Sequence, residues 1–434
     1  MNQSKQSTPK NTNIDYLGEL PKHWKITKLK YIAKYSNGNS ISDNEKNNYK
    51  NKENARPYIA TKDIDLDTST INYDTELYIP YNNSNFKEFV KGCILVCIEG
   101  GSGGRKKGFV TQNISIGNKL CAIKITTKDM NERFMFYIIL SNTFNDFYNA
   151  NIQGDRNGVP LEKIGYFVLP LPPLKEQEKI AKYLDKKISS IDKSLQTTKT
   201  LQQNLKNLKN ALITQCVTKG LDKNAPLKNT NIDYLGEIPK GWGVTRIKIL
   251  FDNKKEKNIG LKNKNLLSLS YGKIINKDIN SAFGLLPESF ETYQIIQKGD
   301  IILRLTDLQN DQRSLRVGLA TQQGIITSAY ITLRQKKKTN DERFFYYFLH
   351  AFDIQKDFYR MGQGVRQNLT YDNLKSLKIP LPPLKEQEKI AKYLDKEVQK
   401  IDTLYKSLSQ LETTLKAFKK ALISDCVLGK KEIK

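Results

Sequence analysis

Two long stretches of the chain carry apolar residues three or four positions apart, the spacing of one face of an α-helix. The first series is Leu184, Ile188, Ile191, Leu195, Leu201, Leu205, Leu208 and Leu212, with Thr198 filling the gap between Leu195 and Leu201. The second series is Leu394, Val398, Ile401, Tyr405, Leu408, Leu411, Leu415, Phe418 and Leu422. Both slip by one residue at the same point, between positions 198 and 201 and between 408 and 411. A stripe this narrow predicts two helices that each need a partner helix.

Both predicted helices open on one identical segment. PLPPLKEQEKIAKYLDK occupies Pro170–Lys186 and reappears unchanged at Pro380–Lys396. The paired prolines stop a helix from continuing upstream, and acidic residues suit the first turn that follows. Glu176–Val217 and Glu386–Val427 hold 42 residues each, which corresponds to a helix of roughly 60 Å. This length favours a rigid spacer over the alternative that each helix packs on its own small domain.

Three further motifs recur in the same order in both halves. NTNIDYLGELPKHW (11–24) returns as NTNIDYLGEIPKGW (229–242) at an offset of 218, and NERFMFY (131–137) and KNALITQCV (209–217) return as DERFFYY (341–347) and KKALISDCV (419–427) at an offset of 210. The chain is therefore a tandem duplication. We expect its halves to be related by an approximate two-fold axis and its two long helices to pair antiparallel.

Between the repeated motifs the halves differ. Alternating or β-branched segments predict strands at 57–64, 92–99, 119–125, 298–305 and 328–334, separated by Gly, Asn and Asp. RFMFYIIL and RFFYYFLH predict a short buried helix that closes each domain. The expected fold class is α+β, with two α/β domains at 1–168 and 219–378 joined by two long antiparallel helices at 169–218 and 379–434. A frame that repeats around different contents suits two recognition surfaces for two targets.

The charge balance indicates what those targets are. Lys and Arg number 71 against 45 Asp and Glu, a formal net charge of +26. Such an excess favours a nucleic acid, because each phosphate neutralised by Lys or Arg releases a condensed counterion. A composition that merely reflects an AT-rich genome is the alternative. No apolar run of eighteen residues occurs and the first residues, MNQSKQSTPK, are polar, so we expect no membrane segment, no signal peptide and a cytoplasmic location.

Metal and thiol chemistry is not indicated. The five cysteines are an odd number, which argues against a disulfide framework, and GCILVCIE suggests that Cys93 and Cys97 lie in a buried strand. His23 and His350 are the only histidines. A zinc site of the usual ligand spacing cannot be assembled from these residues. We expect no metal site and no catalytic residue in this chain.

Two pairs of loops are candidates for nucleic-acid contact. EGGSGGRKKGF (99–109) lacks the Gly-Lys-Ser/Thr of a Walker motif and reads as a strand connection tipped with basic residues, for which DNA contact and a plain surface turn both remain open. Its counterpart, RLTDLQNDQRSLRVG (304–318), mixes Arg with Asn and Gln, the side chains that read guanine and adenine. NIQGDRNG and MGQGVRQNLT precede the long helices and could contact DNA or brace the helix against the domain.

The candidate DNA-contact residues are taken from these loops, from the strand predicted at 57–64 and from the segment 266–275. They are Thr61, Lys62, Arg105, Lys106, Lys107, Gln153, Arg156, Tyr271, Lys273, Arg304, Arg313, Arg316, Gln363, Arg366 and Asn368.

The paired motifs together resemble a known family. NTNIDYLGEIPKGW, a domain ending in IPLPPLKEQEKIAKYLDK and a long heptad helix, each present twice, look like the specificity (S) subunit of type I restriction-modification systems. The resemblance covers nearly the whole chain. LLSLSYGKII (266–275) and the segment from Arg304 to Tyr330 also look like target recognition domain sequence of this family.

The resemblance implies function and partners. Each of two target recognition domains would read one half of a split, asymmetric double-stranded DNA site, with the paired helices holding the domains at a fixed separation. Two adenine-specific methyltransferase subunits would bring S-adenosylmethionine, and two translocating restriction subunits would bring ATP and Mg²⁺. The chain itself would be non-catalytic and bind none of these cofactors. It would lie in the bacterial cytoplasm, associated with the nucleoid.

Two other classes stay open. One is a self-sufficient DNA methyltransferase or nuclease, which would modify DNA without companions. The other is a coiled-coil adaptor without DNA specificity, whose binding to duplex DNA would be absent or insensitive to salt. The same fold could also serve a methylation-only or fused system. The sequence gives neither the recognised bases nor the spacer length.

Overall fold

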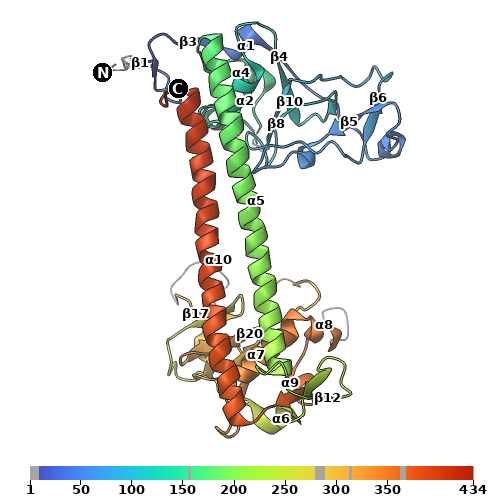
Figure 1. Ribbon diagram of the computed structural model, residues 1–434, viewed down its shortest axis with the longest axis vertical. Coiled ribbons are helices and arrows are strands. Elements are labelled where there is room, and N and C mark those ends of the chain that lie inside the picture. Colours follow the sequence, from blue (N-terminus) through green and yellow to red (C-terminus); the bar gives the residue numbers. More distant parts are fainter. Residues whose placement is uncertain (1–8, 155–157, 279–288, 312–314, 362–367, 434) are drawn as a thin grey trace. The chain divides into compact units, whose positions relative to one another are not determined.

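The computed structural model describes residues 9–154, 158–278, 289–311, 315–361 and 368–433 (Figure 1). The chain divides into two compact units, one made of residues 1–199 with 409–434 and the other of residues 200–408. Each unit combines one globular domain with parts of the two long helices, α5 (Leu174–Lys219) and α10 (Leu384–Val427). The predicted α+β class with two long helices is confirmed.

A four-stranded antiparallel sheet is the centre of each domain. In the first unit its order is β4 (Ala33–Asn37), β10 (Leu120–Ile125), β7 (Ile94–Cys97), β8 (Lys107–Phe109). In the second it is β15 (Phe251–Asn253), β22 (Ile331–Gln335), β19 (Ile301–Leu303), β20 (Val317–Leu319). The registers correspond, since Ala33 opposes Ile125 and Phe251 opposes Gln335. The same frame therefore lies beneath dissimilar sequences.

Helices cover this sheet in both domains. The predicted buried helices are α2 (Glu132–Leu140) and α7 (Glu342–Ile354), each with a side-chain N-cap, Asn131 and Asp341. Short helices accompany them: α1 (Leu29–Ile32), α3 (Asn142–Ala150) and α4 (Leu161–Gly165) in the first unit, and α6 (Ile247–Leu250), α8 (Asp357–Met361) and α9 (Tyr371–Leu374) in the second. Their aromatic side chains fill both cores.

Two small two-stranded sheets also recur. The first unit pairs β1 (Pro9–Asn11) with β2 (Glu19–Pro21) and β3 (Lys25–Lys28) with β11 (Val168–Leu171). The second pairs β12 (Leu227–Asn229) with β13 (Glu237–Pro239) and β14 (Gly243–Arg246) with β23 (Lys378–Leu381). In each unit the repeated DYLGE motif thus forms the turn that leads into β2 or β13, and the first two residues of the repeated PLPP motif end β11 or β23.

The remaining strands differ between the domains. The first unit has a three-stranded sheet of β6 (Tyr78–Pro80), β5 (Ala55–Ile59) and β9 (Ser115–Ile116), with 3₁₀ turns η1 (Lys46–Tyr49) and η2 (Thr61–Asp63). The second has the hairpin β16 (Leu267–Ser270) and β17 (Lys273–Asn276), the pair β18 (Gln294–Ile296) and β21 (Gly324–Ile326), and η3 (Phe290–Thr292). The domains diverge outside the shared sheet.

One buried glutamine explains part of the identical helix opening. Gln177 accepts a hydrogen bond from the backbone N of Asn131 (2.8 Å) and donates to the carbonyls of Pro172 and Asp129 (both 2.8 Å). Gln387 repeats the first two contacts with Asp341 (3.0 Å) and Pro382 (2.8 Å). Each amide joins the start of a long helix to the N-cap of the closing helix, so it holds the helix in one orientation on its own domain.

Within each unit the two long helices run antiparallel. In the first, Asp192 of α5 pairs with Lys419 of α10 (2.6 Å), and Lys431 lies over the ring of Tyr183. In the second, Lys209 pairs with Asp402 (2.7 Å). Residue numbers rise on α5 as they fall on α10, which is the antiparallel arrangement that the duplication predicted.

The predicted apolar seam is buried only in part. Leu184, Ile188, Ile191 and Leu195 are enclosed in the first unit, where the domain also packs on the helix. Other members of the two stripes keep about half of their surface exposed, namely Leu201, Leu208, Tyr405, Leu411 and Phe418. The periodicity identified the helices, but a two-helix seam is narrow and does not cover every apolar position.

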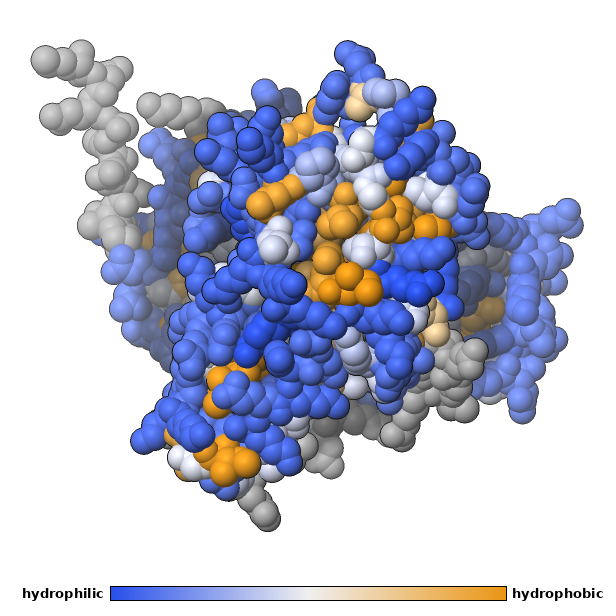
Figure 2. Space-filling model, turned by 90° about the horizontal axis from the view of Figure 1, so that it is seen from below, coloured by the Kyte–Doolittle hydropathy of each residue, from blue (hydrophilic) through white to orange (hydrophobic). Residues whose placement is uncertain are grey.

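On the face that Figure 2 shows, the surface is mainly hydrophilic, with a patch of apolar side chains near the middle and a smaller one toward the lower edge. Exposed apolar residues recur at corresponding positions, with Ile26, Tyr31 and Leu174 in the first unit matched by Val244, Ile249 and Leu384 in the second. In the part of the chain that the structure describes, no helix is long and apolar enough to cross a membrane. All five cysteines are buried, and Cys97 ends β7, within the buried strand predicted at 92–99.

Candidate nucleic-acid interface

The Gly-rich segment forms the predicted strand connection, between β7 and β8. Its backbone folds on itself, with the N of Gly104 donating to the carbonyl of Cys97 (2.7 Å) and Gly103 to Gly100 (2.8 Å). Gly104 has a φ of +67°, and a Cβ there would lie 2.5 Å from the ring of Tyr148, so only glycine fits. Arg105 is exposed at the end of this turn. The turn therefore presents one arginine to solvent.

Lys107 does not belong to this exposed set. Its side chain is enclosed, with 3% of the residue exposed, and Nζ donates to Asn145 Oδ1 (2.5 Å) beside the ring of Phe144. Burial lowers the pKa of this amine to about 7. Consecutive residues of a strand point to opposite faces, and β8 turns Lys107 toward α3. The prediction that Lys107 contacts DNA conflicts with this burial.

Three of the first domain's candidates meet beside the Gly-rich turn. Lys106 Nζ donates to the carbonyl of Thr61 (2.7 Å), which lies on η2. The neighbouring Lys62 is exposed and pairs with Glu76 (2.7 Å). An exposed pair of this kind is weak, so the ammonium could exchange its carboxylate for a phosphate. The structure thus brings Thr61, Lys62 and Lys106 to one place.

The loop before α5 lies against the same turn. Gln153 is exposed and forms a backbone bridge with Gly158. The N of Val159 donates to the carbonyl of Ile98 (3.0 Å), at the start of the Gly-rich segment. Gly154 has a φ of +67°, which suits glycine. Arg156 lies outside the described residues.

In the second domain, Tyr271 and Lys273 occupy the turn of the β16–β17 hairpin. Tyr271 has a φ of 45° and is 82% exposed. Lys273 Nζ reaches Asp402 of α10 (3.1 Å), and Tyr346 donates to the carbonyl of Gly272 (3.4 Å). Lys273 therefore joins the hairpin to the helix, whereas the ring of Tyr271 remains available to a ligand.

The burial of Arg316 also conflicts with the prediction that this residue contacts DNA. Arg316 is 0% exposed, and its Nη1 donates to the carbonyls of Arg304 (3.1 Å) and Thr306 (2.8 Å). Its Nη2 donates to Asp307 (3.3 Å) and to Asp311, and Nε donates to Tyr359 Oη (3.0 Å). A guanidinium whose donors are directed inward cannot also read a base. Arg316 holds the loop that was predicted to read DNA.

The other candidates of the second domain are only partly described. Arg304 is half-buried and lies 3.6 Å from the Asp311 carboxylate. Asn368 Oδ1 accepts from the N of Asp307 (2.7 Å), so Asn368 also supports the 304–311 loop. Arg313, Gln363 and Arg366 lie outside the described residues.

Two buried ionisable groups lie behind this loop on α7. Asp353 Oδ2 accepts from the N of Arg316 (2.6 Å), and burial raises its pKa to about 6. Burial lowers the pKa of His350 to about 4. Both shifts come from removal of the charged form from water. In the described residues, no group of three His, Cys, Asp or Glu side chains could hold a metal ion.

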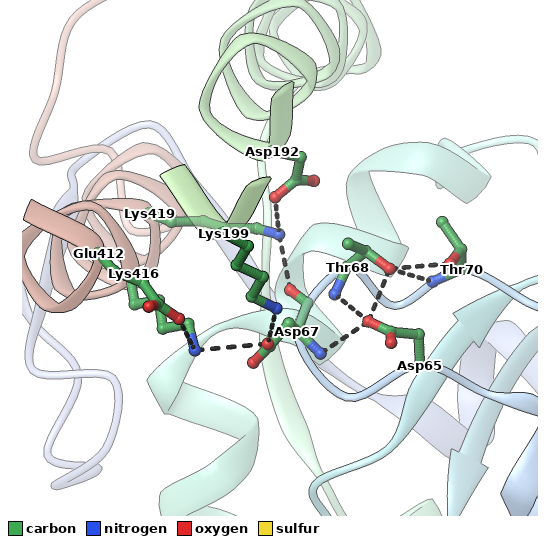
Figure 3. A network of polar contacts seen from close by, with 9 residues as sticks. All are labelled: Asp65, Asp67, Thr68, Thr70, Asp192, Lys199, Glu412, Lys416 and Lys419. Carbon is green, nitrogen blue, oxygen red and sulfur yellow. Dashed lines mark hydrogen bonds and ion pairs between the residues drawn. The ribbon is translucent and has the colours of Figure 1, made fainter. Parts of the chain in front are cut away.

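A surface loop of the first domain grips both long helices (Figure 3). The carboxylate of Asp65 accepts from the backbone N of Asp67 (3.0 Å) and of Thr68 (2.7 Å), which shapes the loop. Asp67 then receives Lys199 of α5 at 2.8 Å and Lys416 of α10 at 3.3 Å. The hydrogen bond from Lys199 lowers the pKa of Asp67.

Lys419 completes this contact. Its Nζ donates to the carbonyl of Asp67 (2.9 Å) and to Asp192 of α5 (2.6 Å) (Figure 3). Lys209 and Asp402 form the matching pair in the second unit. Lys209 lies 210 positions before Lys419, and Asp402 lies 210 positions after Asp192, so the pair is duplicated. Sequence reasoning missed these residues, although the recurrence of an Asp and a Lys at one offset was a usable signal.

A family comparison identifies the repeated unit. The family described as "Type I restriction modification DNA specificity domain" matches residues 21–207 and 239–413. These two segments cover most of the chain and include both shared sheets. The duplicated frame is thus two copies of one family domain.

Curated relatives align with nearly the whole chain. The type I restriction enzyme MjaVIII specificity subunit of Methanocaldococcus jannaschii is 24% identical over 443 positions, covering 96% of this chain and 94% of the relative. The type I restriction enzyme EcoBI specificity subunit of Escherichia coli is 20% identical, covering 92% of this chain and 84% of its own length. The similarity therefore extends through both domains and both long helices.

Solved structures share the fold. A chain from a structure described as the basis of complex assembly and conformational transition of the type I R-M system gives a TM-score of 0.67 at 16% identity, covering 95% of this chain and 99% of that one. The HsdS subunit from Thermoanaerobacter tengcongensis gives 0.50 at 17% identity, covering 95% and 98%. Given the two family matches and this shared fold, the chain belongs to the family of type I restriction-modification DNA specificity subunits.

Proposed function

We propose that this chain reads a split, asymmetric double-stranded DNA site, one half with each domain. The observation that carries the proposal is the four-stranded sheet that recurs in the same register while the segments around it differ. A shared frame with different surface loops is suited to two different half-sites. The net charge of +26 supports a polyanionic ligand.

The long helices would set the separation of the two readouts. Each half-site of a few base pairs provides limited discrimination, but a rigid connection makes the second contact intramolecular. The combined site is then rare and tightly bound. Buried glutamines at both helix starts support this role, since Gln177 and Gln387 hold each helix in one orientation on its domain.

Companion subunits would perform the chemistry. In this proposal two adenine methyltransferase subunits supply S-adenosylmethionine, and two translocating restriction subunits supply ATP and Mg²⁺, while this chain is non-catalytic. The recurrence of exposed Ile26, Tyr31 and Leu174 as Val244, Ile249 and Leu384 supports two equivalent docking surfaces for one kind of partner. In this proposal the assembly acts on DNA, so it would lie in the cytoplasm, associated with the nucleoid.

Methylation mapping tests the proposal. The chain would be expressed with its companion methyltransferase in a host free of adenine methylation, and the modified positions would be sequenced. We expect one split motif with a modified adenine in each half. A continuous palindromic motif would refute the proposal, and methyl transfer by the purified chain alone would favour a self-sufficient enzyme.

Salt dependence separates the remaining alternative. A specificity subunit that contacts several phosphates should lose duplex affinity steeply between 50 and 200 mM salt, on the order of 10³-fold or more. A coiled-coil adaptor without DNA specificity would show no such slope. A methylation-only or fused system would give the same split motif and would differ only in lacking restriction of unmodified DNA.

A further inference from the structure

In each domain one enclosed arginine ties together the backbone of a single surface loop. Arg56 on β5 is 2% exposed, and its Nη2 donates to the carbonyl of Phe86 (2.9 Å). Its Nη1 donates to the carbonyls of Pro80 (3.4 Å) and Tyr81 (3.5 Å). The guanidinium therefore holds both ends of the loop 80–87, which follows β6.

A serine extends this support. Arg56 Nε donates to Ser115 Oγ (2.8 Å), and Ser115 Oγ donates to the carbonyl of Lys87 (2.9 Å). The ring of Phe86 lies 5.4 Å from that of Tyr49, and the N of Tyr81 donates to the carbonyl of Asn54 (3.2 Å). The loop 80–87 thus has one backbone path, set from β5, β9 and the η1 segment.

Arg316 does the same in the second domain, where its guanidinium holds the carbonyls of the loop 304–311. The two arginines are not counterparts, because Arg56 lies on β5 and Arg316 directly precedes β20. Two dissimilar domains therefore use the same device independently. Enclosing a charged guanidinium costs desolvation free energy. A protein tolerates this cost where function requires one fixed loop conformation.

Each loop exposes two amide side chains, and the first loop also exposes Tyr81, Ser84 and Lys87. The amides are Asn82 and Asn85 on the first loop and Gln309 and Asn310 on the second, where Asn310 Nδ2 also donates to Asp307 Oδ1 (2.8 Å). Asn and Gln make paired hydrogen bonds to adenine N6 and N7 in the major groove. In Figure 1, β5 and β6 lie on the side of the first unit away from α5, so the first loop is not covered by the helix within that unit.

Basic residues adjoin the first loop. Lys87 is exposed at its end, and Lys50 is exposed next to η1, which packs on the loop through Tyr49. Phosphate contacts position a protein on the duplex, and base contacts specify sequence. The first domain therefore has amides that suit base contacts and lysines that suit phosphate contacts on one surface. This surface is separate from the Gly-rich turn that the sequence favoured.

We propose that the loops 80–87 and 304–311 are the base-reading loops of the two domains. Asn82 and Asn85 contact base edges of one half-site, and Gln309 and Asn310 contact those of the other. Arg56 and Arg316 are positioning residues that hold the loops in the reading conformation. The inference rests on the proposed function, because it assigns residues to the DNA readout of each domain.

Methylation mapping with paired variants tests this assignment. N82A/N85A and Q309A/N310A would each be expressed with the companion methyltransferase, and the affinity of each for its wild-type site would be measured by fluorescence anisotropy. Each lost amide–base contact should weaken binding roughly 5- to 150-fold. The first variant should relax base preference in one half of the motif only, and the second in the other half only.

Controls separate reading from folding. Gln112→Ala and Gln297→Ala remove exposed amides of the same two domains outside these loops and should leave motif and affinity unchanged. R56K keeps the charge but loses the fork, so it should blur preference in the first half-site while leaving the second half-site and the preferred spacer unchanged. If Arg56 served only to stabilise the domain, R56K would lower methylation of both half-sites together and would change the base preference of neither.

The outcomes are distinguishable. If the wild type gives a split motif and both amide variants give the same motif with unchanged affinity, the loop assignment is wrong and the proposed function stands. If one variant changes both halves, the one-loop-per-half arrangement is wrong. If the wild type gives no split motif, the proposed function itself fails.

Discussion

The duplicated lysine–aspartate pair offers a quantitative prediction, because its two copies differ in their surroundings. Lys419 has 11% of its side chain exposed and donates to two acceptors, Asp192 and the carbonyl of Asp67. Lys209 has 23% exposed and donates to Asp402, which also receives Lys273. Replacing either lysine by methionine keeps the aliphatic stem and removes the donors.

The magnitudes follow from what each variant leaves unpaired. A hydrogen bond to a charged group contributes about 1.5–3 kcal/mol, and partial exposure favours the lower figure. Lys419→Met loses two such bonds, so the first unit should lose about 3 kcal/mol. Lys209→Met loses one, and Asp402 keeps Lys273, so the second unit should lose about 1 kcal/mol.

The chain carries its own reporters for the measurement. It has two tryptophans, Trp24 in the first unit and Trp242 in the second. Trp242→Phe leaves fluorescence from the first unit alone, and Trp24→Phe leaves it from the second. Urea unfolding of each lysine variant in the matching background gives the change in free energy of unfolding from the midpoint at constant slope.

The ranking is the decisive outcome. Equal losses in the two units, or a larger loss for Lys209→Met, would show that the second acceptor on Asp67 contributes nothing. Lys416→Met is the matched control on the same helix: its side chain is 38% exposed and it shares Asp67 with Lys199. That variant should cost no more than about 1 kcal/mol.

Three further changes test other parts of the structure. Lys107→Met should leave DNA affinity unchanged in anisotropy, and loss of affinity would refute the assigned burial. The same change should stabilise the first unit at pH 7, and the gain should grow as pH falls from 10 toward 7. The reason is that burial lowers the pKa of Lys107 to about 7, so the lysine of the unfolded chain becomes protonated at a higher pH than that of the folded chain. Burial lowers the pKa of His350 to about 4, so this residue makes the folded state less stable as pH falls from 6.5 to 4. Burial raises the pKa of Asp353 to about 6, so this residue makes the folded state more stable as pH falls from 6 to 4. Relative to wild type, His350→Leu should therefore become more stable on acidification and Asp353→Asn less stable, as followed by Trp242 fluorescence; shifts of the same sign would contradict this. Inserting four residues into α5, about 6 Å of helix, should change the preferred spacer in methylation mapping while both half-site sequences persist, and an unchanged spacer would exclude the helices as the ruler.

The sequence predicted the parts of the fold that rest on repetition and period. The identical segments at Pro170–Lys186 and Pro380–Lys396 begin helices at Leu174 and Leu384, directly after the paired prolines. Both RF-rich runs are closing helices. These features depend on local chemistry, such as the missing N–H of proline and the spacing of apolar residues, so no tertiary information was needed.

The candidate site was harder to predict, because it depends on which face a side chain takes. Arg105, Lys106 and Lys107 are consecutive basic residues, but adjacent residues of an extended chain point in opposite directions, so the three cannot share one exposed face. Arg316 among Asn and Gln looked like a base reader. A guanidinium has five donors, which equally suits the carbonyls of an irregular loop, and only the structure distinguishes the two uses.

The contacts of the identical segment explain how two domains can diverge around it. Gln177 and Gln387 bind mainly backbone groups: the N of an N-cap residue and the carbonyl of the first proline in each Pro–Pro pair. Backbone groups are present whatever the side chains are, so changes elsewhere in a domain leave this joint intact. The lysines that meet Asp67 depend instead on a loop of the first domain alone. A domain exchanged into this position would keep the glutamine joint but would need its own contact to the helices, as the second domain has in Lys273 and Asp402.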